Sequence, residues 1–189
     1  MDTVGNQERD CINLSQCPHL ERVFPKLASA GYEKTSQRTG RFPLPGAYNC
    51  IAWAANDTHH WWWPENGFWP FWLDRAVTID CFVRAFRWLG YRKCGHSGRE
   101  IGFEKIALYT FRGVPTHMAR QLSDGSWTSK IGAEEDITHY TLDALESYSA
   151  PHGEYGDAVL YMRRLIAVSW LVQVMQFFYW RFEVLKGNS

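Results

Sequence analysis

The repeat of apolar residues changes after residue 89 of this chain, and that change constrains its fold. Residues 78–89 carry apolar side chains three and four positions apart, which predicts an amphipathic helix with Ile79, Phe82, Val83, Phe86 and Leu89 on one face. Residues 105–111, 116–122 and 127–131 alternate instead with the two-residue repeat of strands. Helices followed by antiparallel strands are typical of an α+β domain.

A hairpin joins two of these strands. Asp124 and Gly125 lie between 116–122 and 127–131 and form a common hairpin turn pair. Residues 158–162 form a further apolar strand candidate, and residues 136–145 are interpreted as a short helix or turn. We therefore expect an antiparallel sheet of about 3–5 strands.

Length and composition indicate one domain. The chain has 189 residues and no internal repeat. We expect a poorly ordered segment at 1–19, a folded domain at 20–162 and a C-terminal helix at 163–189. Lys and Arg total 20 and Asp and Glu total 20, so the net charge of zero gives no indication of nucleic-acid binding.

The N-terminal residues are polar and lack the apolar core of a secretory signal. We therefore expect a cytoplasmic protein, with export by a route that needs no cleavable signal as the alternative. Five cysteines in such a chain are expected to be reduced. Cys11, Cys17 and His19 do not follow standard zinc spacing, so we expect no metal and no cofactor.

Residues 165–180 form an apolar stretch near the C-terminus. The stretch is short for a bilayer span, which needs about 20 apolar residues. We therefore expect a helix that packs on the domain, forms a homodimer or docks on a partner. Membrane contact is the less favoured alternative.

Cys50 stands where an extended segment meets a helical run that is rich in alanine. Pro43 and Pro45 precede it, and Ile51-Ala52-Trp53-Ala54-Ala55 follows. A thiol in the first turn of a helix lies near unpaired N–H groups and the positive end of the helix dipole. Both favour the thiolate, so Cys50 is a candidate nucleophile.

His117 is the candidate base, because imidazole titrates near neutrality. It lies near the start of the strand predicted at 116–122 and shares one face of that strand with Ala119, which is small enough to allow a helix to pack closely. A Cys–His pair needs a third group that orients the ring. A three-residue hairpin loop would place Ser129 there, a two-residue turn would place Thr128 and Lys130 there, and Asp136 and His139 are further candidates.

These features resemble the papain-like cysteine peptidase superfamily. The resemblance is to NlpC/P60 and transglutaminase-like cores, and the strand that begins at His117 and returns at Trp127 carries it. Four segments also resemble a family of uncharacterised bacterial proteins: Tyr48–Ala54, Trp61–Pro64, Gly102–Tyr109 and Trp127–Lys130. Two positions depart from the superfamily patterns: no acid follows on the strand after His117, and Leu44 stands where papain-like enzymes place a glutamine.

The resemblance implies a papain-like fold and a thiol hydrolase or acyltransferase that acts on an amide or isopeptide bond of a peptide or protein. Cys50 would attack, His117 would move the proton and Ser129 would orient the ring. Asn49, Tyr48 and Trp53 would bind the oxyanion and the substrate. Protease, deamidase and amidase activities, also in a toxin or effector, fit this chemistry.

The segment from Trp61 to Trp72 suggests the alternative. Five Trp, two Pro and one Gly predict a loop that is held by aromatic burial rather than a regular element. In a non-catalytic binding module on the same scaffold, this aromatic loop would be the recognition surface.

Overall fold

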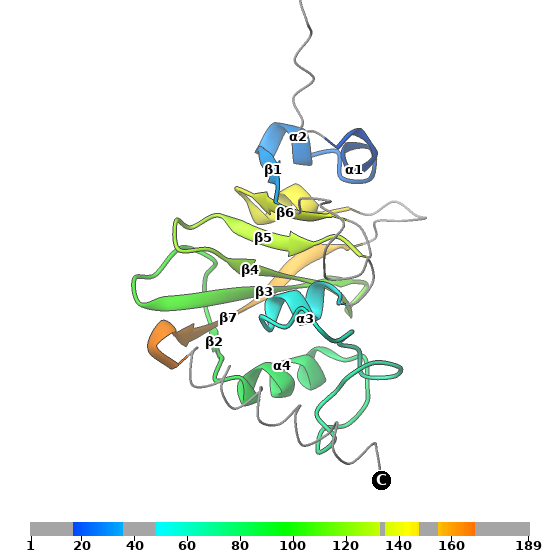
Figure 1. Ribbon diagram of the computed structural model, residues 1–189, viewed down its shortest axis with the longest axis vertical. Coiled ribbons are helices and arrows are strands. Elements are labelled where there is room, and N and C mark those ends of the chain that lie inside the picture. The colour runs from blue at the N-terminus through cyan, green and yellow to red at the C-terminus, as the bar shows by residue number, and fades with distance from the viewer. Residues whose placement is uncertain (1–16, 36–47, 133–134, 148–154, 169–189) are drawn as a thin grey trace, which may run out of the picture.

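The computed structural model describes residues 17–35, 48–132, 135–147 and 155–168. One antiparallel sheet, in the order β1-β6-β5-β4-β3-β7-β2, forms its centre (Figure 1). The strands are β1 (Tyr32–Lys34), β2 (Arg92–Cys94), β3 (Phe103–Phe111), β4 (Val114–Gln121), β5 (Trp127–Lys130), β6 (Asp136–His139) and β7 (Asp157–Leu165). The neighbours β3, β4, β5 and β6 follow one another in the sequence, so short connections build the middle of the sheet.

Short helices flank this sheet. They are α1 (Pro18–Val23), α2 (Leu27–Ala30), α3 (Cys50–Ala54), α4 (Ile79–Trp88) and the 3-10 helix η1 (Leu142–Leu145). The helix predicted at 78–89 is α4, and Thr78 Oγ1 accepts a hydrogen bond of 3.3 Å from the amide of Cys81 at its start. Figure 1 shows α1 and α2 at the β1 end of the sheet and α4 at the β2 end.

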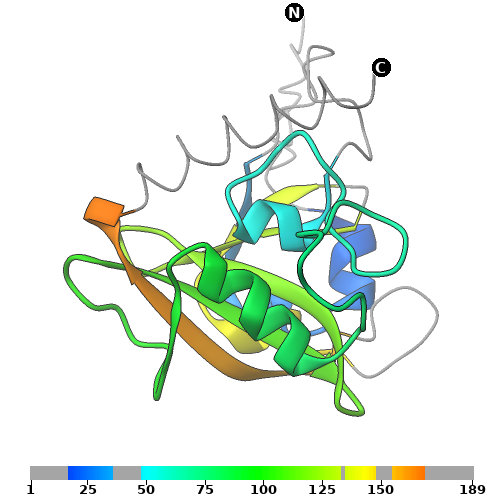
Figure 2. The same ribbon diagram turned by 90° about the horizontal axis from the view of Figure 1, so that it is seen from below.

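Two hydrophobic clusters cover the two faces of the sheet. Leu108 and Met118 pack with α3 and α4 in the first cluster, whereas Ala107 and Ala119 pack with α1, α2 and η1 in the second. Figure 2 shows α3 and α4 on the same side of the sheet. Successive strand residues point to opposite faces, so the same two strands supply both clusters. Residues of β4 therefore alternate between the α3 side and the α1 side.

The prediction of a papain-like core with about 3–5 strands is wrong. The sheet has seven strands and is richer in β structure than that core. Strands β1 and β2 have three residues each, which is too short for a two-residue repeat to be recognised. Strand β6 occupies Asp136–His139, within the segment interpreted as a helix or turn.

The β4–β5 hairpin has the longer of the two loops considered. Gln121 pairs with Trp127, and the amide of Leu122 donates to the carbonyl of Ser126 at 2.8 Å. Gly125 has a φ of 99°, which glycine adopts readily. This three-residue loop places Ser129 on the same face as His117.

The expected terminal segments fall largely outside the described residues. Strand β7 runs to Leu165 and helical residues follow at 166–168, so the strand occupies the first part of the helix predicted at 163–189. Residues 1–16 and 169–189 are not described. Among the residues that are, no helix has the length and apolar character needed to cross a membrane.

Candidate functional site

Asn49 begins helix α3 and ties it to the aromatic loop. Its Oδ1 accepts from the amides of Ala52 at 3.0 Å and Trp62 at 3.3 Å, and its Nδ2 donates to the Trp62 carbonyl at 2.7 Å. Asparagine is a preferred residue at this helix position because it satisfies free N–H groups. Both polar atoms of the Asn49 amide are therefore engaged in holding the start of α3.

The thiol of Cys50 lies in the first turn of α3 and is almost enclosed, with 7% of the residue exposed. Burial raises its pKa to about 11, although hydrogen bonds from the backbone amides of Met118, Ile51 and Cys50 act in the opposite direction. The expectation of a thiolate is therefore reversed. Sequence reasoning found the helix amides but missed Met118, which reaches the sulfur from strand β4.

Tyr48 and Trp53 join α3 to the sheet. The Tyr48 hydroxyl donates to Asp136 Oδ2 at 2.7 Å, and Trp53 Nε1 donates to Thr128 Oγ1 at 3.1 Å. The two rings stack with centroids 5.8 Å apart. Tyr48, Trp53 and Asn49, expected to bind the oxyanion or substrate, thus already have intramolecular partners.

His117 is completely buried on the other side of β4. Its ring stacks on Tyr155 with centroids 4.2 Å apart and meets the edge of Tyr109 at 5.2 Å. Its Nε2 lies 3.1 Å from Ser129 Oγ, whereas its Nδ1 has no hydrogen-bond partner among the residues that the structure describes. Burial, with a smaller effect from His139, lowers the pKa of His117 well below its usual value, so the ring is neutral.

Ser129 also contacts a second histidine. Its Oγ lies 3.0 Å from His139 Nε2, and His139 Nδ1 lies 2.7 Å from the carbonyl oxygen of Thr141. Burial lowers the pKa of His139 to about 4, against the opposing effects of the Thr141 hydrogen bond and the Asp143 charge. The buried side chains of His117, Ser129 and His139 form one chain of contacts that ends at the carbonyl of the exposed residue Thr141, and we call it the histidine relay.

Cys50 lies next to β4 at Met118, which is the residue after the candidate base His117. The Cys50 sulfur accepts from the amide of Met118 and belongs to the cluster on the α3 side. The ring of His117 contacts Tyr109, which belongs to the cluster on the α1 side. No hydrogen bond joins the sulfur to Nδ1 of His117.

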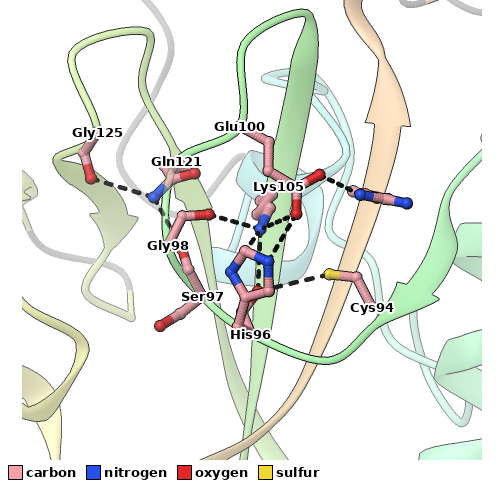
Figure 3. A network of polar contacts seen from close by, with 9 residues as sticks. Cys94, His96, Ser97, Gly98, Glu100, Lys105, Gln121 and Gly125 are labelled. Carbon is pink, nitrogen blue, oxygen red and sulfur yellow. Dashed lines mark hydrogen bonds and ion pairs between the residues drawn. The ribbon is translucent and has the colours of Figure 1, made fainter.

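A second buried polar network surrounds Lys105 (Figure 3). Its Nζ is fully enclosed and donates to the carbonyls of His96 at 3.0 Å and Gly98 at 2.5 Å and to Glu100 Oε1 at 2.9 Å. Gln121 Nε2 binds the Ser97 carbonyl at 3.0 Å beside it. Together these donors fix the loop 95–100 on the sheet, which is a structural role.

A pocket of about 470 Å³ adjoins this loop. Ser97, Gln121, Trp127, Thr141 and Asp143 are among the residues that line it, and Cys50 and His117 are not. Within the described ranges, no three His, Cys, Asp or Glu side chains are grouped in a way that could hold a metal ion. Cys11 of the candidate zinc set lies outside those ranges.

The described part of the chain thus defines an antiparallel sheet domain with a buried thiol at a helix start and a histidine relay on the sheet. The chain belongs to the family described as a domain of unknown function, DUF7689, whose model matches residues 33–163. That match begins within β1 and ends within β7, and it includes the thiol and the relay. Comparisons with curated proteins and with solved structures find no match.

Proposed function

We propose that the protein is a thiol hydrolase or acyltransferase that acts on an amide or isopeptide bond, with Cys50 as nucleophile and His117 as base. The observation that carries this proposal is the bare Nδ1 of His117. A buried ring nitrogen without a partner costs roughly 1–3 kcal/mol, and native structures keep few such groups. A nitrogen that accepts a proton during a reaction accounts for this cost.

The surroundings of the sulfur support the same role. The backbone amides of Met118, Ile51 and Cys50 act to lower the pKa of the Cys50 thiol, against the effect of burial. Fixed N–H groups next to a nucleophile are also placed to stabilise the oxyanion that develops when it attacks a carbonyl. These amides take the role that the sequence assigned to Asn49, Tyr48 and Trp53.

The reaction starts from a neutral pair. His117 Nδ1 removes the thiol proton as the sulfur electron pair forms a bond to the carbonyl carbon, and the carbonyl π electrons move to oxygen. Collapse of this intermediate breaks the C–N bond, and the proton on His117 passes to the leaving amine. Water then releases the acyl group as an acid, or an amine accepts it.

Because the Cys50 sulfur packs on the α3 side of β4 and the His117 ring on the α1 side, this step requires a rearrangement of β4 that brings the two groups together when substrate binds. Catalytic hydrogen bonds are often long before substrate binds. In the described part of the chain, the group that lies against Nε2 of His117 is the neutral hydroxyl of Ser129 and not a carboxylate. We therefore expect a slower enzyme than one with an acid in that position.

Alkylation by iodoacetamide at neutral pH tests this proposal. Peptide mass spectrometry would follow modification of Cys50 in the wild type, in His117→Ala and in His59→Ala, a matched change at an exposed histidine. We expect His117→Ala to slow Cys50 alkylation about 10²-fold or more, as for loss of a general base, and His59→Ala to leave it unchanged. Equal rates in all three proteins would refute His117 as the base.

A second candidate is a non-catalytic binding module, favoured by the enclosure of the Cys50 thiol. Its recognition surface would be the aromatic loop, where Trp61 is 39% exposed. Asp57 Oδ2 anchors this loop by accepting from Trp62 Nε1 at 2.6 Å and from His60 Nδ1 at 2.9 Å, so Trp61 extends from a fixed base. In that case Cys50 would react only after the protein unfolds.

A further inference from the structure

We propose that His139 is a positioning residue that sets the protonation of His117. His139, fixed by the Thr141 carbonyl, acts on His117 through the hydroxyl of Ser129. It keeps the proton of the His117 ring on Nε2 and leaves Nδ1 as an unprotonated acceptor. The hydrogen bonds of the relay alone determine which ring nitrogen of each histidine carries the proton, and we call this assignment the order of protons. Its catalytic meaning rests on the function proposed above, in which Nδ1 of His117 takes the thiol proton.

The Thr141 carbonyl determines the direction of the relay. A carbonyl oxygen only accepts hydrogen bonds, so His139 Nδ1, at 2.7 Å, must carry a proton. His139 is fully buried and neutral, and a neutral imidazole carries one N–H only. Nε2 of His139 is therefore an unprotonated acceptor.

Ser129 passes this constraint on to His117. The Ser129 hydroxyl has one hydrogen, and at 3.0 Å from the bare Nε2 of His139 it must donate there. Its oxygen then accepts, so His117 Nε2, at 3.1 Å, must be the N–H donor. A neutral His117 with its proton on Nε2 has a bare Nδ1, the atom for which the structure shows no partner.

The opposite order of protons fails at both ends of the relay. It would place the bare Nδ1 of His139 against the Thr141 carbonyl at 2.7 Å, two acceptors in contact. It would also leave a buried N–H on His117 Nδ1 without an acceptor. An unpaired buried donor costs about as much as an unpaired acceptor, so the contact at Thr141 decides the direction.

Ser129 alone could not make this choice, because a hydroxyl donates or accepts equally well. The second histidine removes that freedom. His139 thus acts on the base without touching it, while Ser129 is the group in contact. The relay positions one lone pair of His117 in the same way that a carboxylate does in other Cys–His sites, but without adding a negative charge.

Nitrogen-15 NMR of the full-length wild-type protein at neutral pH tests the order directly. Long-range correlations between ring carbon-bound protons and ring nitrogens distinguish the two neutral forms of each histidine. We expect His139 to carry its proton on Nδ1 and His117 on Nε2, two opposite forms in one protein. A proton on Nε2 of His139, or on Nδ1 of His117, would overturn the proposal whatever the activity of the protein.

Two substitutions at one position extend the test. His139→Gln retains a carbonyl acceptor for the Ser129 hydroxyl, and we expect His117 to keep its proton on Nε2. His139→Phe removes that acceptor and frees Ser129 to donate to Nε2 of His117, so a proton should appear on Nδ1 of His117. Cys50 alkylation should then slow about two- to tenfold, because a smaller fraction of the molecules has the unprotonated Nδ1 that accepts the thiol proton. An unchanged His117 spectrum in His139→Phe would contradict the relay. If this variant does not fold, the wild-type spectrum alone tests the predicted protonation of the two histidines.

The two proposals can fail separately. If the wild-type protons lie as expected but His117→Ala leaves Cys50 alkylation unchanged, the positioning relay stands and the hydrolase is refuted. If the protons lie in the opposite order while His117→Ala slows alkylation, the base stands and the role of His139 is refuted.

Discussion

Mild acid should weaken this fold through His139. The pKa of its ring falls from 6.5 to about 4 on folding, so below pH 6.5 the unfolded chain binds a proton that the folded chain does not. The contribution of His139 is complete above that pH and is lost as the pH falls toward 4. From pH 6.5 to about pH 5 the loss is roughly 2 kcal/mol, at about 1.4 kcal/mol per pH unit. His117 acts in the same direction.

Urea unfolding at about pH 7.5 and about pH 5 measures this effect as the change in the free energy of unfolding. The comparison includes His139→Gln, which cannot titrate, and His59→Gln as a matched change at an exposed histidine. We expect wild type and His59→Gln to lose about 2 kcal/mol more on acidification than His139→Gln loses. An equal loss in all three proteins would refute the conclusion that His139 is buried and neutral.

Three further changes test the packing around the candidate site. The pKa of the Cys50 thiol is about 11 in the folded protein and about 9 in the unfolded chain. The wild type should therefore lose about 1 kcal/mol of stability by about pH 10 that Cys50→Ala does not lose, and parallel urea curves would contradict this. Lys105→Met should cost about 3–5 kcal/mol because it leaves the carbonyls of His96 and Gly98 without their donor and removes one of the partners of Glu100, which keeps Arg163. The change Lys93→Met at an exposed lysine should cost under about 0.5 kcal/mol, and equal costs would refute the network. Gly156 has a φ of 67°, and a Cβ added there would lie 1.9 Å from the Thr110 carbonyl oxygen. Gly156→Ala should therefore lower the melting temperature by several degrees. An unchanged melting temperature would contradict that contact.

The long elements of the fold could be predicted because their patterns are local. Helix α4 and the β4–β5 hairpin follow from apolar spacing and from the Asp124-Gly125 pair. The edge strands β1 and β2 could not be found, because pairing with neighbouring strands rather than a pattern of their own defines three-residue strands. Strands β1 and β2, together with β6, whose segment was interpreted as a helix or turn, account for the strands that the sequence did not predict.

At the candidate site, sequence reasoning identified groups but not their environment. Ser129 was one of several alternatives beside His117, and only the length of the hairpin loop selects it. The amide of Met118 and the enclosure of Cys50 arise from packing between α3 and β4, which local sequence does not describe. For the same reason the pKa of Cys50 was predicted in the wrong direction: the helix-start amides are local, whereas the burial that outweighs them is not.

The pH dependence of Cys50 alkylation tests the central claim most directly. With a pKa of about 11, only about one Cys50 in 10⁴ is a thiolate at pH 7, and this fraction grows tenfold per pH unit. If neutral His117 removes the proton during attack, the wild-type rate should be nearly constant from about pH 7 to 9, because both reacting groups keep their protonation states. His117→Ala should instead show a rate that rises about tenfold per unit. A tenfold rise per unit in the wild type as well would contradict the account.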